Sequence, residues 1–248
     1  MSPSMVQDAR SFVAGATGYT GQAVISELRS RGIDAVAHVR PDSARLHEFT
    51  TKFETLGATV DTTPWETSAF EETFRRLRPT LVFALLGTTK ARARAAAASA
   101  EGRSQIAETY EAVDYGLSSL LIGATVSATP SARFVYLSSL GITESTRNPY
   151  LRARLRVERE LEKSPLDYVS FRPSFITGDD REEDRGGERF AAKATDALLS
   201  IGGHLGAGRL RDRYQSVDAA ALASHLVDLG LASEPMRRVV QIDEVRAR

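Results

Sequence analysis

Three glycines spaced three residues apart near the N-terminus constrain this chain more than any other feature. The segment from Gly15 to Gly21 reads GATGYTG. It follows the apolar run Ser11–Ala14, which predicts a buried strand, and it leads into the amphipathic run Tyr19–Arg31, which predicts a helix. A tight turn between a strand and a helix needs residues without a Cβ atom, and it lets the backbone approach a phosphate closely.

This turn predicts a binding site for a dinucleotide. The N-terminus of a helix offers free N–H groups and the positive end of the helix dipole to an anion. The alternative is a glycine-rich turn that binds nothing, which the flanking strand and helix disfavour. The residues expected to contact the cofactor here are Gly15, Thr17, Gly18, Tyr19, Thr20 and Gly21.

The rest of the chain predicts an α/β fold. Short apolar runs alternate with longer amphipathic runs, which is typical of βαβ units and a parallel sheet. Further strands are expected at 34–39, 58–62, 81–86, 133–137, 168–171 and 239–242, and further helices at 42–56, 66–77, 110–127, 150–163 and just after Asp218. We therefore expect a doubly wound, mostly parallel Rossmann sheet within one domain spanning residues 1–248.

The last third of the chain departs from this alternation. We expect residues 174–235, approximately, to form a small lobe on the substrate side, with the charged loop Gly178–Gly187 as a mobile lid. The segment Lys90–Gly102, rich in alanine and arginine, is interpreted as a solvated helical insertion.

Composition excludes several kinds of function. The chain has no cysteine, which rules out disulfides, thiolate nucleophiles and cysteine-bound metals, and its four histidines lack the spacing of metal ligands. The 32 basic and 32 acidic residues cancel, so a nucleic-acid partner is not expected. No apolar run is long enough for a membrane span or a secretory signal, and a cytoplasmic location is expected.

The end of the second expected strand favours NADP(H) over NAD(H). A site for NAD(H) would place an acidic residue there to bond the ribose 2′-hydroxyl. This chain instead has Arg40, followed by Ser43, and a cation and a hydroxyl suit a 2′-phosphate. The alternative is that Arg40 is an ordinary surface residue. Asp61, after the third strand, could meet the amino group of adenine or could be an exposed turn residue.

Four segments resemble the atypical short-chain dehydrogenase/reductase family, and in particular its NAD(P)H-binding group of TIP30-like and NmrA-like proteins. In chain order they are GATGYTG, Leu85–Thr89 (LLGTT), Val135–Ser139 (VYLSS) and Phe171–Phe175 (FRPSF). The resemblance implies a parallel sheet of about seven strands with helices on both faces.

The same resemblance assigns further contacts to the cofactor. It implies that Gly87 and Thr88 pass close to the adenosine ribose and the pyrophosphate, and Leu86 is expected to contact the cofactor as well. It also implies that Pro173 and Phe175 lie beside the nicotinamide. Asp114 falls where related enzymes often carry asparagine.

A catalytic group is implied as well. The family uses a serine or threonine after the fifth strand, and a tyrosine and a lysine four residues apart on the next helix. Ser139 and Tyr150 match, and Arg154 stands where the lysine is expected. Ser139 would polarise a carbonyl, Tyr150 would transfer the proton, and Arg154 would bind the nicotinamide ribose and tune Tyr150.

The replacement of lysine by arginine weakens the case for catalysis more than the case for binding. A guanidinium stays protonated and cannot readily join a proton relay. Arg154 also belongs to a run of alternating charges, which is typical of a solvated or inter-subunit helix face. Tyr150 could simply pack at the start of its helix, and Ser139 could belong to a plain turn.

The leading hypothesis is an NADP(H)-binding oxidoreductase of the atypical short-chain type that acts on a carbonyl or alcohol group of a small molecule. The alternative is a catalytically degenerate regulatory module that senses NADP(H) and binds a protein partner. A sugar-nucleotide epimerase or dehydratase fits less well, because those enzymes usually carry a larger C-terminal lobe. The charged helix at 150–163 could supply the face of a homodimer.

Overall fold

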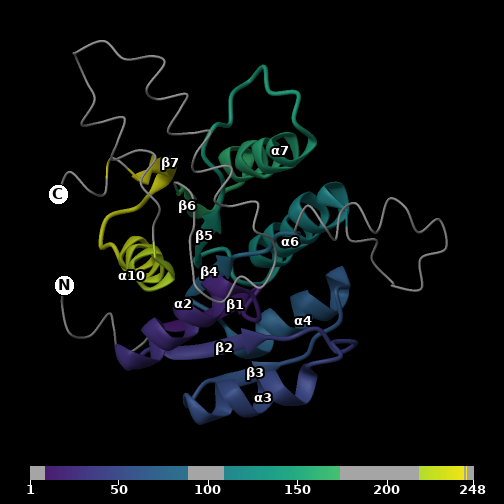
Figure 1. Ribbon diagram of the computed structural model, residues 1–248, viewed down its shortest axis with the longest axis vertical. Helices are drawn as coiled ribbons and strands as arrows, with labels where there is room; N and C mark the ends of the chain where they lie inside the picture. Colours follow the sequence, from purple (N-terminus) through teal and green to yellow (C-terminus); the bar gives the residue numbers. More distant parts are fainter. Residues whose placement is uncertain (1–8, 89–108, 174–217, 243, 245–248) are drawn as a thin grey trace, which may run out of the picture.

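Seven parallel strands form one sheet (Figure 1). The computed structural model describes residues 9–88, 109–173, 218–242 and 244. The strands are β1 (Arg10–Ala14), β2 (Asp34–His38), β3 (Thr59–Asp61), β4 (Leu81–Ala84), β5 (Arg133–Leu137), β6 (Asp167–Arg172) and β7 (Arg237–Gln241). Their order, β3-β2-β1-β4-β5-β6-β7, steps outward from β1 in both directions, as in a doubly wound Rossmann sheet. The predicted fold class is confirmed.

Helices cover both faces of the sheet (Figure 1). One face carries α2 (Tyr19–Ser30), α3 (Leu46–Thr55) and α10 (Ala219–Gly230), and the other carries α4 (Thr67–Leu77), α6 (Ser118–Ala128) and α7 (Pro149–Lys163). Successive strand residues point to opposite faces, so Val13 and Phe83 enter the first core while Phe12 and Val82 enter the second. Every residue of β4 and β5 is buried, because both of their faces are covered.

Two helices differ from the predicted ones. The helix expected from Asp42 begins at Leu46, because residues 42–45 form turns in which Ser43 accepts the amides of Arg45 and Leu46. The single helix expected at 110–127 begins instead as a π-helix, η1 (Tyr110–Leu117), and continues as α6. A π-helix interrupts the regular helical ladder and frequently lies at a functional site.

Several predicted segments lie outside the described residues: the insertion at 90–102, the lid at 178–187 and most of the substrate-side lobe. The described part of the range 174–235 includes α10, which packs against α2 on the Rossmann sheet. The strand β7 then extends the sheet by pairing with β6.

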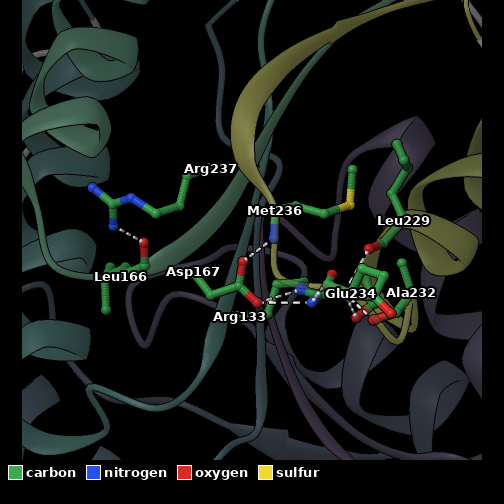
Figure 2. A network of polar contacts seen from close by, with 9 residues as sticks. Arg133, Leu166, Asp167, Leu229, Ala232, Glu234, Met236 and Arg237 are labelled. Carbon is green, nitrogen blue, oxygen red and sulfur yellow. Dashed lines mark hydrogen bonds and ion pairs between the residues drawn. The ribbon is translucent and has the colours of Figure 1, made fainter.

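Arg133, at the start of β5, fastens the C-terminal segment to the sheet (Figure 2). Its Nε and Nη2 donate to Asp167 Oδ2 at 2.9 and 2.7 Å, and Asp167 Oδ1 accepts the amide of Met236 at 2.6 Å. The same guanidinium donates to the carbonyl groups of Leu229, Gly230, Ala232 and Glu234. Only 8% of Arg133 is exposed, and its hydrogen bonds compensate for the cost of burying its charge.

We predict that Arg133→Met lowers the free energy of unfolding by about 2–4 kcal/mol, because it leaves Asp167 and several carbonyl groups without their donor. Urea unfolding measures the change. Arg75→Met is the control, since Arg75 forms an exposed i,i+4 pair with Glu71 and should change stability by no more than about 0.5 kcal/mol. Equal losses in the two variants would contradict the role given to Arg133.

Candidate functional site

A cleft of about 660 Å³ opens where the central strands end. Its volume lies within the range typical of small-molecule sites, and its position is the usual ligand crevice of a doubly wound sheet. The predicted residues that line it are Gly15, Thr17, Gly18, Tyr19, Thr20, Gly21, Arg40, Ser43, Leu86, Gly87, Thr88, Tyr150 and Arg154. The fold therefore brings most of the predicted site residues together around one space.

The glycine turn is packed so closely that side chains do not fit. Gly15 has a φ of +82°, and a Cβ atom there would lie 2.6 Å from the carbonyl oxygen of Leu85. A Cβ atom at Gly21 would lie 2.1 Å from the carbonyl oxygen of Gly15. The turn thus sits directly against the end of β4 and the first turn of α2, which leaves its backbone open to the cleft.

The first turn of α2 suits an anion. Gly18 is the N-cap and contributes no side chain, and no acidic residue occurs in the first turn. The N–H groups at the start of a helix lack helical acceptors and carry the positive end of its dipole. Since Thr17 to Gly21 line the cleft, this geometry fits the pyrophosphate of a dinucleotide.

Basic side chains follow β2 along the same cleft. The side chain of Arg40 is 39% exposed, with its Nε 3.7 Å from Asp42 Oδ1. Arg45, which sequence reasoning missed, donates to both carboxylate oxygens of Glu48 at 2.7 and 2.5 Å, and its guanidinium lies 4.6 Å from the ring centroid of Phe49. No aspartate or glutamate is among the described residues that line the cleft, so the lining favours an anionic ligand.

Asp61 lies to one side of this cleft. Its Oδ1 accepts the amide of Thr63 at 3.0 Å and its Oδ2 lies 3.4 Å from Nη2 of Arg76. Asp61 is not among the described lining residues, whereas His38 and Trp65 are. Burial lowers the pKa of His38, whose Nε2 donates to the carbonyl oxygen of Thr63 at 2.8 Å, so the imidazole is neutral.

Tyr150 enters the cleft from the first turn of α7. The side chain of Asn148 caps this helix by accepting the amide of Tyr150 at 2.9 Å, and Pro149 occupies the first helical position, which favours helix initiation. The ring of Tyr150 lies 5.4 Å from that of Tyr110, which also lines the cleft and was not predicted from the sequence.

Arg154, one turn further along α7, is 4% exposed. Its Nη2 donates to Asp114 Oδ1 at 2.7 Å and to the carbonyl oxygen of Leu86 at 2.8 Å, and its Nη1 donates to the carbonyl oxygen of Leu137. Burial raises the pKa of Asp114, and the charge of Arg154 and the amide of Thr88 oppose that rise. Arg154 and Asp114 thus form a buried ion pair at the base of the cleft.

Glu158, a further turn along α7, organises the ends of β5 and β6. It is buried, accepts the hydroxyl of Ser138 at 2.6 Å and pairs with Arg172 at 2.9 and 2.5 Å. Ser138 lines the cleft. Ser139 is half-buried, donates to the carbonyl oxygen of Leu140 at 3.3 Å and is not among the described lining residues.

The alternating charges of this helix therefore do not form one solvated face. Arg154 and Glu158 point inward, whereas Arg156 and Arg159 are exposed and pair with the carboxylates of other segments. The solvated-face interpretation is wrong for the first two residues and fits the last two.

The remaining assignments concern the segment after β6. Pro173 is buried and is not among the described lining residues of the cleft. Phe175 lies outside the described residues.

In the described part of the chain, no group of three His, Asp or Glu side chains could hold a metal ion. Among those same residues, no helix has both the length and the apolar character that crossing a membrane requires.

Comparison with known proteins identifies the family to which this sequence belongs. The sequence profile of the NAD(P)H-binding family matches residues 15–198. No curated protein matches the chain.

Solved structures share the fold at low sequence identity. A short-chain type dehydrogenase/reductase from Mycobacterium ulcerans has a TM-score of 0.68 at 14% identity, over 95% of this chain and 88% of that one. ChuY, an anaerobillin reductase from Escherichia coli O157:H7, has a TM-score of 0.60 at 16% identity, over 94% and 96%. UDP-N-acetylglucosamine 4-epimerase from Bacillus cereus has a TM-score of 0.62 at 13% identity, over 94% and 78%. The family profile confirms the resemblance found in the sequence, and the chain belongs to the NAD(P)H-binding family.

Proposed function

We propose that this protein is an NADP(H)-dependent oxidoreductase that acts on a carbonyl or alcohol group of a small molecule. The observation that carries the proposal is that one cleft joins the glycine turn, the arginines after β2 and the phenol of Tyr150. Similar solved structures that are named a reductase and a dehydrogenase/reductase support this class of reaction.

The arginines after β2 support NADP(H) rather than NAD(H). Arg40 and Arg45 flank Ser43 on the cleft wall. A dinucleotide with its pyrophosphate on the glycine turn would place its 2′-phosphate beside these residues. Their present ion pairs with Asp42 and Glu48 are solvent-exposed and contribute little to stability, so a phosphate dianion can compete for both guanidinium groups.

Tyr150 and Ser139 are the proposed catalytic residues. The bound cofactor would supply or accept the hydride. In reduction, the hydroxyl of Tyr150 donates its proton to the carbonyl oxygen of the substrate, and in oxidation the phenolate of Tyr150 takes the proton from the alcohol. The hydroxyl of Ser139 would orient the carbonyl group, which requires it to give up its bond to Leu140 and to reach the cleft that the adjacent Ser138 lines.

Tyr150→Phe should lower kcat by about 10²–10⁴-fold, because it removes the proton donor and keeps the ring. NADPH affinity should stay within about twofold, since the cradle of the phosphates is untouched. Turnover of NADPH with a panel of aldehydes, ketones and quinones measures the first, and a fluorescence titration the second. Tyr115→Phe is the control, because Tyr115 lies on η1 and is not among the described residues that line the cleft. Wild-type protein that binds NADPH and turns over no compound of a broad panel would contradict the enzymatic function.

Arg40→Ala and Arg45→Ala should each weaken NADPH binding about tenfold or more, because each removes a charged hydrogen-bond donor from the 2′-phosphate. NADH affinity should not change, and Arg75→Ala, at an exposed position on α4, should alter neither. Calorimetric titration with both dinucleotides measures the effect. Equal weakening of NADPH and NADH would place the arginines elsewhere on the ligand.

Gly21→Ala should abolish binding of both dinucleotides, because the new methyl group meets the Gly15 backbone and must displace the turn. Gly123→Ala is the matched control: its site on α6 is open, and alanine should stabilise the helix by up to about 1 kcal/mol. Thermal unfolding with and without NADPH measures both. A Gly21→Ala variant that binds normally would show that this turn does not hold the cofactor.

A further inference from the structure

The hydrogen-bond donors of Arg154 are almost all used by the protein itself. A guanidinium has five N–H groups. Nη2 bonds Leu86 and Asp114, while Nη1 bonds Leu137 and faces the hydroxyl of Tyr136 at 3.4 Å. Nε has no acceptor among the described residues, and it is buried by protein atoms. None of the terminal N–H groups is therefore available for the hydroxyl groups of a ribose.

These bonds join four parts of the fold. Leu86 follows β4, Leu137 ends β5, Asp114 lies within η1, and Arg154 comes from α7. The second oxygen of Asp114 accepts the amide of Thr88 at 3.1 Å. The pair thus holds the segment 86–88, which lines the cleft, from two points.

The guanidinium of Arg154 lies so close to the segment 86–88 that no side chain would fit at Gly87. A Cβ atom at Gly87 would lie 2.6 Å from Arg154 Nη2 and 3.4 Å from Asp114 Oδ1. Because the guanidinium is buried and bonded on both of its terminal nitrogens, it cannot move aside as a free side chain would. Arg154 therefore lies directly against the backbone that forms the cleft wall.

Arg154 also contacts the face of the proposed catalytic ring. Its Cζ lies 5.2 Å from the ring centroid of Tyr150 and 5.6 Å from that of Tyr136. A cation over an aromatic face attracts the ring through its quadrupole. This contact favours one orientation of the Tyr150 ring.

We propose that Arg154 and Asp114 act as a pair of positioning residues, which fix the cleft segment 86–88 and the ring of Tyr150 relative to each other, and that Arg154 makes no bond to the cofactor. The inference rests on the proposed function, which supplies the cofactor and the role of Tyr150. It replaces the ribose-binding and tuning role that the resemblance implied for Arg154. Lysine cannot substitute, because its three donors are on one atom, whereas the present acceptors are bonded from two nitrogens of a planar fork.

Three variants test the pair: Arg154→Lys, Asp114→Asn and the double variant, which places at both positions the residues that related enzymes often carry. We expect each single variant to weaken NADPH binding about tenfold and to lower kcat, because each loses bonds to the segment 86–88. The double variant should bind NADPH no more weakly than the single variant that binds it most weakly, since both changes break the same pair. The shape of the pH profile of kcat should be unchanged throughout.

A direct role in proton relay or ribose binding predicts the opposite. The double variant would then gain kcat over wild type, or Arg154→Lys would shift the pH profile at unchanged NADPH affinity. Either result would overturn the proposal.

Gly87→Ala provides a variant that keeps both charges. The added methyl group meets Nη2, so NADPH affinity should fall as it does in Arg154→Lys. Gly116→Ala is the control on η1, because its Cβ atom would meet only the carbonyl oxygen of Glu111, at 3.4 Å. Unchanged affinity in Gly87→Ala would overturn the proposal even if the Arg154 variants fail to fold.

A thermal double-mutant cycle of the three Arg154 and Asp114 variants needs no cofactor. If the double variant loses less Tm than the two single variants lose in sum, the result supports the pair. A loss equal to that sum overturns it. If the wild type binds neither NADPH nor NADH, the proposed function fails, and this cycle still decides whether the two residues act together.

Discussion

A buried cation limits how the site of this protein can be arranged. Arg154 is almost fully removed from water, and a charge in that position must be paired and hydrogen-bonded. Its partners come from residues 86, 114 and 137, which are far apart in the sequence. The charge of Arg154 is therefore paired and hydrogen-bonded only when the ends of β4 and β5, the π-helix η1 and α7 are all correctly placed relative to one another.

Glu158 extends the same principle by one helical turn. Tyr150, Arg154 and Glu158 are spaced four residues apart, so they share one face of α7. Arg154 holds the ends of β4 and β5, and Glu158 holds the end of β5 through Ser138 and the end of β6 through Arg172. One helix thus presents the phenol to the cleft and also fixes the strand ends that form the cleft floor, which couples site geometry to fold stability.

The sequence predicted the sheet well, because buried parallel strands are nearly continuous apolar runs. The strand at 133–137 has the predicted bounds, and β1, β2 and β4 agree within two residues at each end. Helix starts were harder to predict. The helix α3 begins late because Ser43 stabilises a local turn, and η1 is a π-helix that a search for 3.6-residue periodicity does not distinguish from an α-helix.

The lining of the candidate site was predictable where adjacent residues define it. The turn from Gly15 to Gly21 and the arginine after β2 are read from adjacent residues, and they do line one cleft. The inward direction of Arg154 and Glu158 was not predictable in this way. Their charged neighbours on α7 look the same in sequence. Only partners 14 to 68 residues away distinguish the buried Arg154 and Glu158 from the exposed residues. Arg45 was missed because the expected helix start placed it inside α3 rather than at its N-cap.

The crystal structure of the complex with NADP⁺ tests this account most directly. It should show the pyrophosphate on the turn after β1, the 2′-phosphate against Arg40 and Arg45, and Arg154 still bonded to Asp114 and Leu86 with no cofactor atom within hydrogen-bond distance. A complex in which Arg154 leaves Asp114 and bonds the nicotinamide ribose would contradict it.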